Sequence, residues 1–136
     1  MEYSINKEKQ TIHAKFLGAM KSETLIQHIL TIRADKYFQK GFNIVIDLRS
    51  AHVPKGYMQI AQIADFVKIT SVRRSKFKLA LLADNPEQIR SARLYALLVG
   101  QRNIQVCQSI KTAEDWVSHE SVPERISSEK IEDNIP

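Results

Sequence analysis

The chain has 136 residues, of which 43% are hydrophobic and 26% are charged, and its formal net charge is +5. These values are typical of one soluble globular domain. Because the chain has no run of about 18 apolar residues and its N-terminus lacks the basic start and apolar stretch of a secretion signal, we expect a cytoplasmic protein without a transmembrane segment.

The first elements along the chain are a predicted β-hairpin and a predicted helix. Residues 3–5 and 11–16 are short runs of partly alternating polarity separated by a charged turn, which predicts two antiparallel strands toward an edge of a sheet. After Ser22, apolar residues recur at helical spacing. This pattern predicts a helix over about residues 22–39, with Ser22 as its N-cap and Gly41 just after its end.

Residues 42–49, Phe-Asn-Ile-Val-Ile-Asp-Leu-Arg, are predicted to form the central strand of the domain. The run of β-branched residues is apolar on both faces, so helices must cover the strand from both sides. A loop over Ser50–Gly56 follows, and the next helix is predicted from about Tyr57 to Val72.

This second helix is apolar nearly all round. Its inner face is centred on Ile60, whereas Met58, Phe66 and Ile69 fall on the far side by helical spacing. A helix of this kind is covered on two sides. We therefore expect its outer face to meet a second subunit, the C-terminal tail or a bound apolar ligand.

The next elements alternate strands with a helix. Strands are predicted over residues 77–83 and 103–107. A helix is predicted between them, because Asn85 suits an N-cap, Pro86 suits the first helical position and Gly100 suits the residue after the end.

The C-terminal part of the chain is predicted to hold a short helix and a tail. The helix starts with Thr112 as its cap and packs Trp116 inward, and residues 121–136 form a polar, mobile tail. The single cysteine, Cys107, excludes an internal disulfide and a cysteine-based metal site, and we expect it to be a small buried core residue. The domain then spans residues 1–120 as an α/β fold, with a mixed, mostly parallel sheet of about five strands and about four flanking helices.

The order of these elements resembles the SpoIIAA-like branch of the STAS superfamily, which is related in fold to lipid-carrying CRAL-TRIO domains. The resemblance covers about residues 1–120 and is clearest in Ile44–Arg49, Lys78–Asp84 and Thr112–Val117. It implies a regulatory or binding role. In the anti-sigma-factor antagonists of this superfamily, a serine that opens the helix after the central strand is phosphorylated. The matching turn here is Val53–Tyr57 and has no serine, so we do not expect that switch.

The sequence contains no recognisable catalytic motif. It has no glycine-rich phosphate loop, no HExxH, no Gly-x-Ser-x-Gly and no His/Cys cluster with metal spacing, so we expect no enzyme, no metal and no cofactor. His13 falls within a predicted strand, without a carboxylate placed near it by the sequence. The one acid/base arrangement that the pattern offers is Asp47, His52 and Asp84 near the ends of two parallel strands, where we expect the aspartates to brace loops.

Two functions are therefore open. The first is a non-enzymatic STAS-like regulatory or interaction module that binds a protein partner, or itself as a homodimer, through the loop Ser50–Gly56 and the outer face of the second helix. The second is a small carrier or sensor of a lipid or other anionic or apolar ligand, held between the second and third helices. The ligand's polar end would meet Arg90 or Arg93.

Basic residues are concentrated in the second half of the domain, at Arg73, Arg74, Lys76, Lys78, Arg90, Arg93 and Arg102. No aromatic residues alternate with these arginines as a base-stacking surface would require, so the sequence carries no specific signal for nucleic-acid binding. The candidate residues for binding a ligand or partner are Asp47, Arg49, His52, Lys55, Tyr57, Met58, Phe66, Arg90 and Arg93.

Overall fold

A computed structural model describes residues 1–39, 41–70, 77–100 and 103–118 of the chain. Its strands are β1 (Glu2–Asn6), β2 (Thr11–Lys15), β3 (Gly18–Ala19), β4 (Asn43–Asp47), β5 (Ala51–His52), β6 (Leu79–Leu82) and β7 (Ile104–Cys107). Its helices are α1 (Ser22–Arg33), α2 (Tyr57–Thr70), α3 (Pro86–Val99) and α4 (Ile110–Ser118).

Five strands form the main sheet in the order β1-β2-β4-β6-β7. The pairs β2 with β4, β4 with β6 and β6 with β7 are parallel, and β1 is antiparallel to β2. β3 and β5 form a separate parallel pair. The prediction of an α/β chain with a mostly parallel sheet of about five strands and about four helices is confirmed for the described residues.

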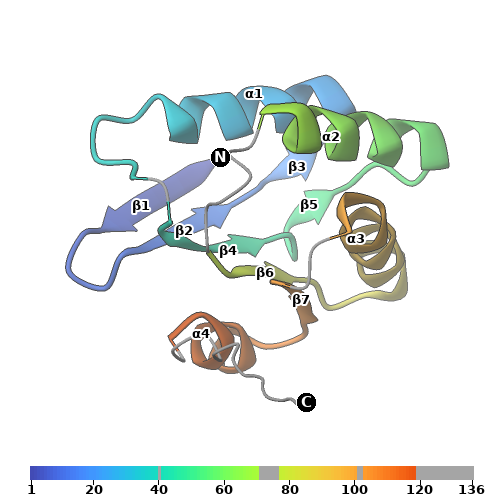
Figure 1. The fold of residues 1–136 in the computed structure, drawn as a ribbon. Coiled ribbons are helices and arrows are strands. Elements are labelled where there is room, and N and C mark those ends of the chain that lie inside the picture. Colours follow the sequence, from blue (N-terminus) through green and yellow to red (C-terminus); the bar gives the residue numbers. More distant parts are fainter. Residues whose placement is uncertain (40, 71–76, 101–102, 119–136) are drawn as a thin grey trace, which may run out of the picture.

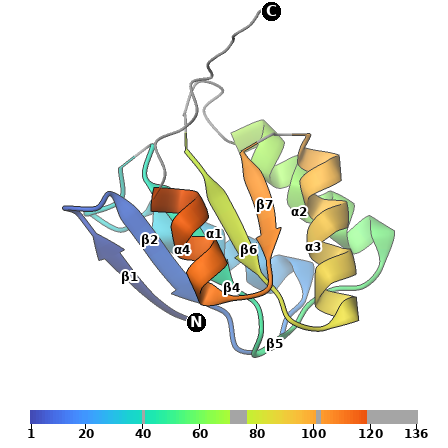
Figure 2. The same ribbon diagram turned by 90° about the horizontal axis from the view of Figure 1, so that it is seen from below.

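The helices form layers of unequal size on the two faces of the sheet. α1, α2 and α3 lie over one face (Figure 1), and α4 packs against the other face (Figure 2). The core on the three-helix side includes Ile12, Phe16, Leu25, Ile63, Leu79, Leu81 and Ala92. The core under α4 is smaller and consists of Val45, Ala80, Cys107, Ala113 and Val117, with Trp116 at its margin. The central strand β4 is therefore covered on both faces, and Cys107 is buried, as the sequence predicts.

The first helix is shorter than predicted. α1 ends at Arg33 instead of continuing to residue 39. The chain turns at Asp35, whose carboxylate accepts hydrogen bonds from the Tyr37 amide at 2.8 Å and from the Tyr3 hydroxyl at 2.7 Å. Because these two bonds hold the carboxylate in a turn, the helix does not continue through Asp35.

Two of the predicted N-caps are wrong. Lys21 occupies the N-cap position of α1, and the Ser22 hydroxyl, inside the helix, donates to Gln62 Oε1 of α2 at 2.8 Å. At the start of α4, Ser109 accepts a hydrogen bond from the Thr112 amide at 3.2 Å. Ser109 therefore caps α4, and Thr112 lies within the helix.

The third helix agrees with its prediction at both ends. The Asn85 side chain accepts a hydrogen bond from the Gln88 amide at 2.9 Å, and Pro86 is the first helical residue. Gly100 ends the helix in the left-handed conformation with a φ of 74°, which favours glycine over residues with a Cβ.

The short strands β3 and β5 were not predicted. β5 lies within Ser50–Gly56, which the sequence indicates to be a loop, and two residues are too few to show a period of two. α2 ends at Thr70. The rest of the predicted helix to Val72, the tail over 121–136, and Arg73, Arg74, Lys76 and Arg102 lie outside the described residues.

Candidate functional site

Several of the predicted site residues lie at the edge of the main sheet where the parallel strands end. Asp47 is the last residue of β4, and Asp84 follows β6 by two residues. The loop between β4 and α2 crosses this edge and contains the short strand β5. In open α/β sheets, ligands and partners commonly bind at the carboxyl ends of the strands.

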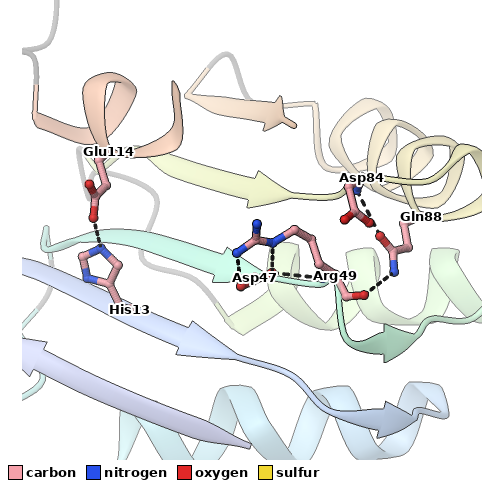
Figure 3. A network of polar contacts seen from close by, with 6 residues as sticks. All are labelled: His13, Asp47, Arg49, Asp84, Gln88 and Glu114. Carbon is pink, nitrogen blue, oxygen red and sulfur yellow. Dashed lines mark hydrogen bonds and ion pairs between the residues drawn. The ribbon is translucent and has the colours of Figure 1, made fainter. Parts of the chain in front are cut away.

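Asp47 and Arg49 form an ion pair with two parallel hydrogen bonds (Figure 3). Arg49 Nε donates to one carboxylate oxygen and Nη2 to the other, each at 3.0 Å, and the Arg49 amide donates to Oδ1 at 3.0 Å. Partial burial raises the pKa of the Asp47 carboxyl, but the hydrogen bonds and charge of Arg49 outweigh it and hold that pKa below its usual range. The Asp47 carboxylate is therefore ionised and hydrogen-bonded to Arg49, which makes it a poor proton acceptor.

A buried amide behind this pair connects the two loops of the edge. Gln88, in the first turn of α3, is only 4% exposed. Its Nε2 donates to the Arg49 carbonyl oxygen at 3.2 Å, and its Oε1 accepts from the Asp84 amide at 3.1 Å (Figure 3). Nε2 also donates to the Ala51 carbonyl oxygen at 3.1 Å. Sequence reasoning missed Gln88. The sequence feature that could have indicated Gln88 is its place as a long polar side chain on the inner face of α3, where Ser91 and Ala92 are small.

Two further contacts fix the same loop from inside. The Ser91 hydroxyl donates to the Pro54 carbonyl oxygen at 2.9 Å, in a buried position. On the opposite side, β5 pairs with β3, and the Met20 amide donates to the His52 carbonyl oxygen at 3.0 Å. Hydrogen bonds from α3 and from β3 therefore hold the backbone from residue 49 to residue 54.

The outer side of this loop and the first turn of α2 carry four exposed side chains, which we call the loop surface: His52, Lys55, Tyr57 and Met58. Tyr57 is 59% exposed and Met58 is 81% exposed. Lys55 Nζ lies 2.7 Å from Oε2 of Glu87, and this hydrogen bond is the main reason why the pKa of the Glu87 carboxyl lies below its usual range. The loop surface thus combines the large side chains of Tyr57 and Met58 with a lysine that is paired with Glu87 of α3.

The other predicted site residues, Phe66, Arg90 and Arg93, are not part of the loop surface, although Arg90 acts electrostatically on Glu87, the partner of Lys55. Phe66 is half-buried, with the Arg33 guanidinium carbon 5.7 Å from its ring centroid. Arg90 and Arg93 are exposed on α3. His52 acts electrostatically on Glu87, whereas Asp47 is bound by Arg49.

An apolar cavity of about 90 Å³ lies between the sheet and α1, α2 and α3. It is lined by Phe16, Leu25, Ile29, Ile46, Leu48, Val53, Pro54, Ile60, Ile63, Leu79, Leu81, Ser91, Ala92 and Tyr95. Burial raises the pKa of the Tyr95 hydroxyl to about 12, so this group stays protonated. The predicted ligand contacts Met58, Phe66, Arg90 and Arg93 are not among the lining residues.

A separate polar contact lies on the α4 side of the sheet. His13 Nε2 of β2 is 3.6 Å from Oε2 of Glu114 in α4 (Figure 3). No local sequence signal places a carboxylate near His13, because His13 and Glu114 are about one hundred positions apart. The contact links α4 to β2 and lies outside the loop surface.

Comparisons with known proteins leave the resemblance to the SpoIIAA-like branch as a prediction. Protein-family models, curated proteins and solved structures give no match. In the described ranges, no helix is long and apolar enough to cross a membrane. Nor do three or more His, Cys, Asp or Glu side chains of these ranges gather where they could hold a metal ion.

Replacing Gln88 with leucine tests its role in positioning the loop. We expect Gln88→Leu to lower the free energy of unfolding by about 2 to 3 kcal/mol, because the variant removes the partner of the buried Ala51 carbonyl and of the part-buried Arg49 carbonyl and Asp84 amide. Urea unfolding measures this change. Hydrogen exchange should also become faster for the amides of residues 49–53. Gln59→Leu, at an exposed position of α2, should stay within about 0.5 kcal/mol of the wild type, and an equal loss in both variants would contradict the role of Gln88.

Replacing Arg49 with methionine tests the ion pair through its pH dependence. Asp47 has a lowered pKa in the folded chain, so its stabilisation is present above the usual aspartate pKa and is lost as the pH falls through the folded value. We expect Arg49→Met to cost about 0.5 to 1 kcal/mol at neutral pH, because the pair is partly exposed, and almost nothing in strong acid. Urea unfolding at both pH values measures the difference. Arg93→Met serves as the control, and an Arg49→Met effect that is independent of pH would contradict the assignment.

Proposed function

We propose that the chain is a non-enzymatic, STAS-like interaction module that binds a protein partner through the loop surface. The observation that supports this most is the contrast between a firmly held loop and the exposed residues that follow it. Hydrogen bonds from Gln88, Ser91 and Met20 hold the loop backbone, while Tyr57 and Met58, in the first turn of α2, are exposed. A loop fixed in this way loses little conformational entropy when a partner binds.

The composition of the loop surface supports a protein partner. Tyrosine and methionine are enriched at the centre of protein interfaces, and charged residues such as Lys55 and Glu87 suit the rim. Methionine also adapts its shape to the partner. Because the Asp47 carboxylate is ion-paired with Arg49, a structural role at this edge is favoured over acid/base catalysis.

The double variant Tyr57→Ser, Met58→Ser tests the loop surface. We expect it to fold as the wild type does, because both side chains are exposed, and to weaken partner binding at least about 10-fold through loss of the apolar contacts. A photo-crosslinking residue at position 59 would first identify the partner in extracts of the cells that make the protein, and titration of the purified partner then measures affinity. Ile69→Ser is the control, because Ile69 is 82% exposed at the other end of α2.

The comparison of the two variants decides the proposal. Loss of binding in the double variant with normal binding in Ile69→Ser supports the loop surface. Equal binding by both variants would place the interface elsewhere, and equal loss would show that α2 as a whole forms the contact.

The cavity motivates a second proposal, that the chain is a sensor of a small apolar or amphipathic ligand. Its volume of about 90 Å³ is well below the roughly 300 to 1,000 Å³ of common ligand pockets. A lipid acyl chain would require α1, α2 and α3 to move apart, whereas a molecule of a few carbon atoms needs a smaller adjustment. The cavity therefore favours a small ligand over a lipid.

Filling the cavity tests the second proposal. We expect 1-hexanol or hexanoic acid to raise the melting temperature of the wild type by several degrees, because a ligand that binds only the folded chain stabilises it. Ala92 lines the cavity on α3 and is 3% exposed, so Ala92→Leu should abolish this shift by occupying the space. Absence of any shift, together with a native mass spectrum without retained small molecules, would refute the proposal.

A further inference from the structure

Among the residues that the structure describes, no strand pairs with the outer side of β1, so the main sheet ends there in an open edge. β1 is the outermost strand beside β2 (Figure 2), whereas β7 at the other edge contacts both α3 and α4. β1 pairs with β2 regularly over five residues, from Glu2 with Lys15 to Asn6 with Thr11. It contains no proline, no lysine and no bulge, three of the features that commonly protect an edge strand from pairing, and its only charged residue is Glu2.

The hydrogen bonds of β2 show which backbone groups of β1 face the open edge. The Phe16 amide donates to the Asp47 carbonyl oxygen at 3.0 Å, so the backbone of the even-numbered residues of β2 faces β4. The odd-numbered residues then face β1, and one of them, His13, lies opposite Ser4. Successive residues of a strand direct their backbone groups to opposite sides, so Tyr3 and Ile5 direct theirs to the open edge.

We propose that β1 pairs with β1 of a second copy of this chain, antiparallel and across a two-fold axis at Ser4. Tyr3 then lies opposite Ile5 of the second copy, and the two residues exchange both backbone hydrogen bonds. The symmetry repeats this exchange on the other side of the axis. The product is one sheet of ten strands, five from each copy.

The side chains of β1 suit this arrangement on both faces of the sheet. Tyr3 and Ile5 are half-buried and pack against the larger core, so pairing extends that core from one copy to the next. The Tyr3 hydroxyl donates to Asp35, which orients the ring before association. On the other face, Glu2, Ser4 and Asn6 are exposed.

The charges of β1 are compatible with the same register. In a pairing centred on Ser4, Glu2 lies opposite Asn6 of the second copy, an uncharged amide that can donate to the carboxylate. Ser4 lies opposite Ser4. Within the five residues of β1, no two like charges are therefore opposed, and Lys15 on β2 lies beside Glu2.

The expected dimer is of moderate affinity. Pairing of a single short strand covers less than the roughly 800 Å² per partner of a standard interface. We therefore expect a dissociation constant in the micromolar range. This inference goes beyond the proposed function, because β1 lies at the opposite edge of the sheet from α3 and the pairing makes no use of the loop surface (Figure 1).

Two variants with opposite charges at position 4 test both the β1–β1 pairing and the position of its two-fold axis. Ser4 is exposed, so Ser4→Lys and Ser4→Glu should fold normally. Each places two like charges directly across the axis, and we expect each to weaken self-association at least about 10-fold. An equimolar mixture of the two variants should associate at least as tightly as the wild type. Sedimentation equilibrium from micromolar to submillimolar concentration measures all three, with Gln108→Lys as a control of equal charge change at an exposed position after β7.

Weakening by both single variants, recovery in the mixture and wild-type behaviour of Gln108→Lys are the expected results. A wild-type chain that stays monomeric across this range overturns the proposal. So does a dimer that tolerates both single variants, or a mixture that associates no better than either variant alone. None of these results depends on whether a protein partner binds the loop surface.

Discussion

The buried amide of Gln88 is the interaction on which the geometry of the carboxyl edge depends. A buried amide without partners is costly, so its position requires the carbonyl groups of Arg49 and Ala51 and the Asp84 amide to stay within reach. These groups belong to two loops that follow neighbouring strands. One side chain of α3 therefore sets where the loop after β4 lies, and with it the direction in which Lys55 and Tyr57 point.

The two faces of the sheet are stabilised by different means. On the three-helix side, large aliphatic and aromatic side chains fill the core. Under α4 the core side chains are small, and hydrogen bonds to the last turn of the helix complete the attachment. Asn43 Nδ2 donates to the Val117 carbonyl oxygen at 2.7 Å, and Lys78 Nζ donates to that of Trp116 at 3.1 Å. A cation at the C-terminus of a helix also opposes the negative end of its dipole, so Lys78 stabilises α4 although burial lowers its pKa.

Local sequence signals predicted the elements that have local causes. α3 was placed correctly because Asn85, Pro86 and Gly100 determine its ends within the helix itself. The end of α1 was missed because Asp35 is held partly by the Tyr3 hydroxyl, 32 residues away. In the site, the sequence located Asp47, Arg49, His52 and the loop near the strand ends. It could not find Gln88, whose partners are distant in sequence, nor show that Phe66 is half-buried beside Arg33.

The loop from Ser50 to Gly56 connects the two proposed functions physically. Val53 and Pro54 line the apolar cavity, and Pro54 is also fixed by the Ser91 hydroxyl. Lys55, the next residue, is exposed and pairs with Glu87, and Tyr57 and Met58 begin α2. A ligand that enlarges the cavity has to displace Val53, Pro54 or the inner face of α2, because a packed core transmits such strain instead of absorbing it. The same displacement moves Tyr57 and Met58. If a ligand binds the displaced and the undisplaced conformation of the loop with different affinity, its binding in the cavity is therefore coupled to partner binding at the loop surface.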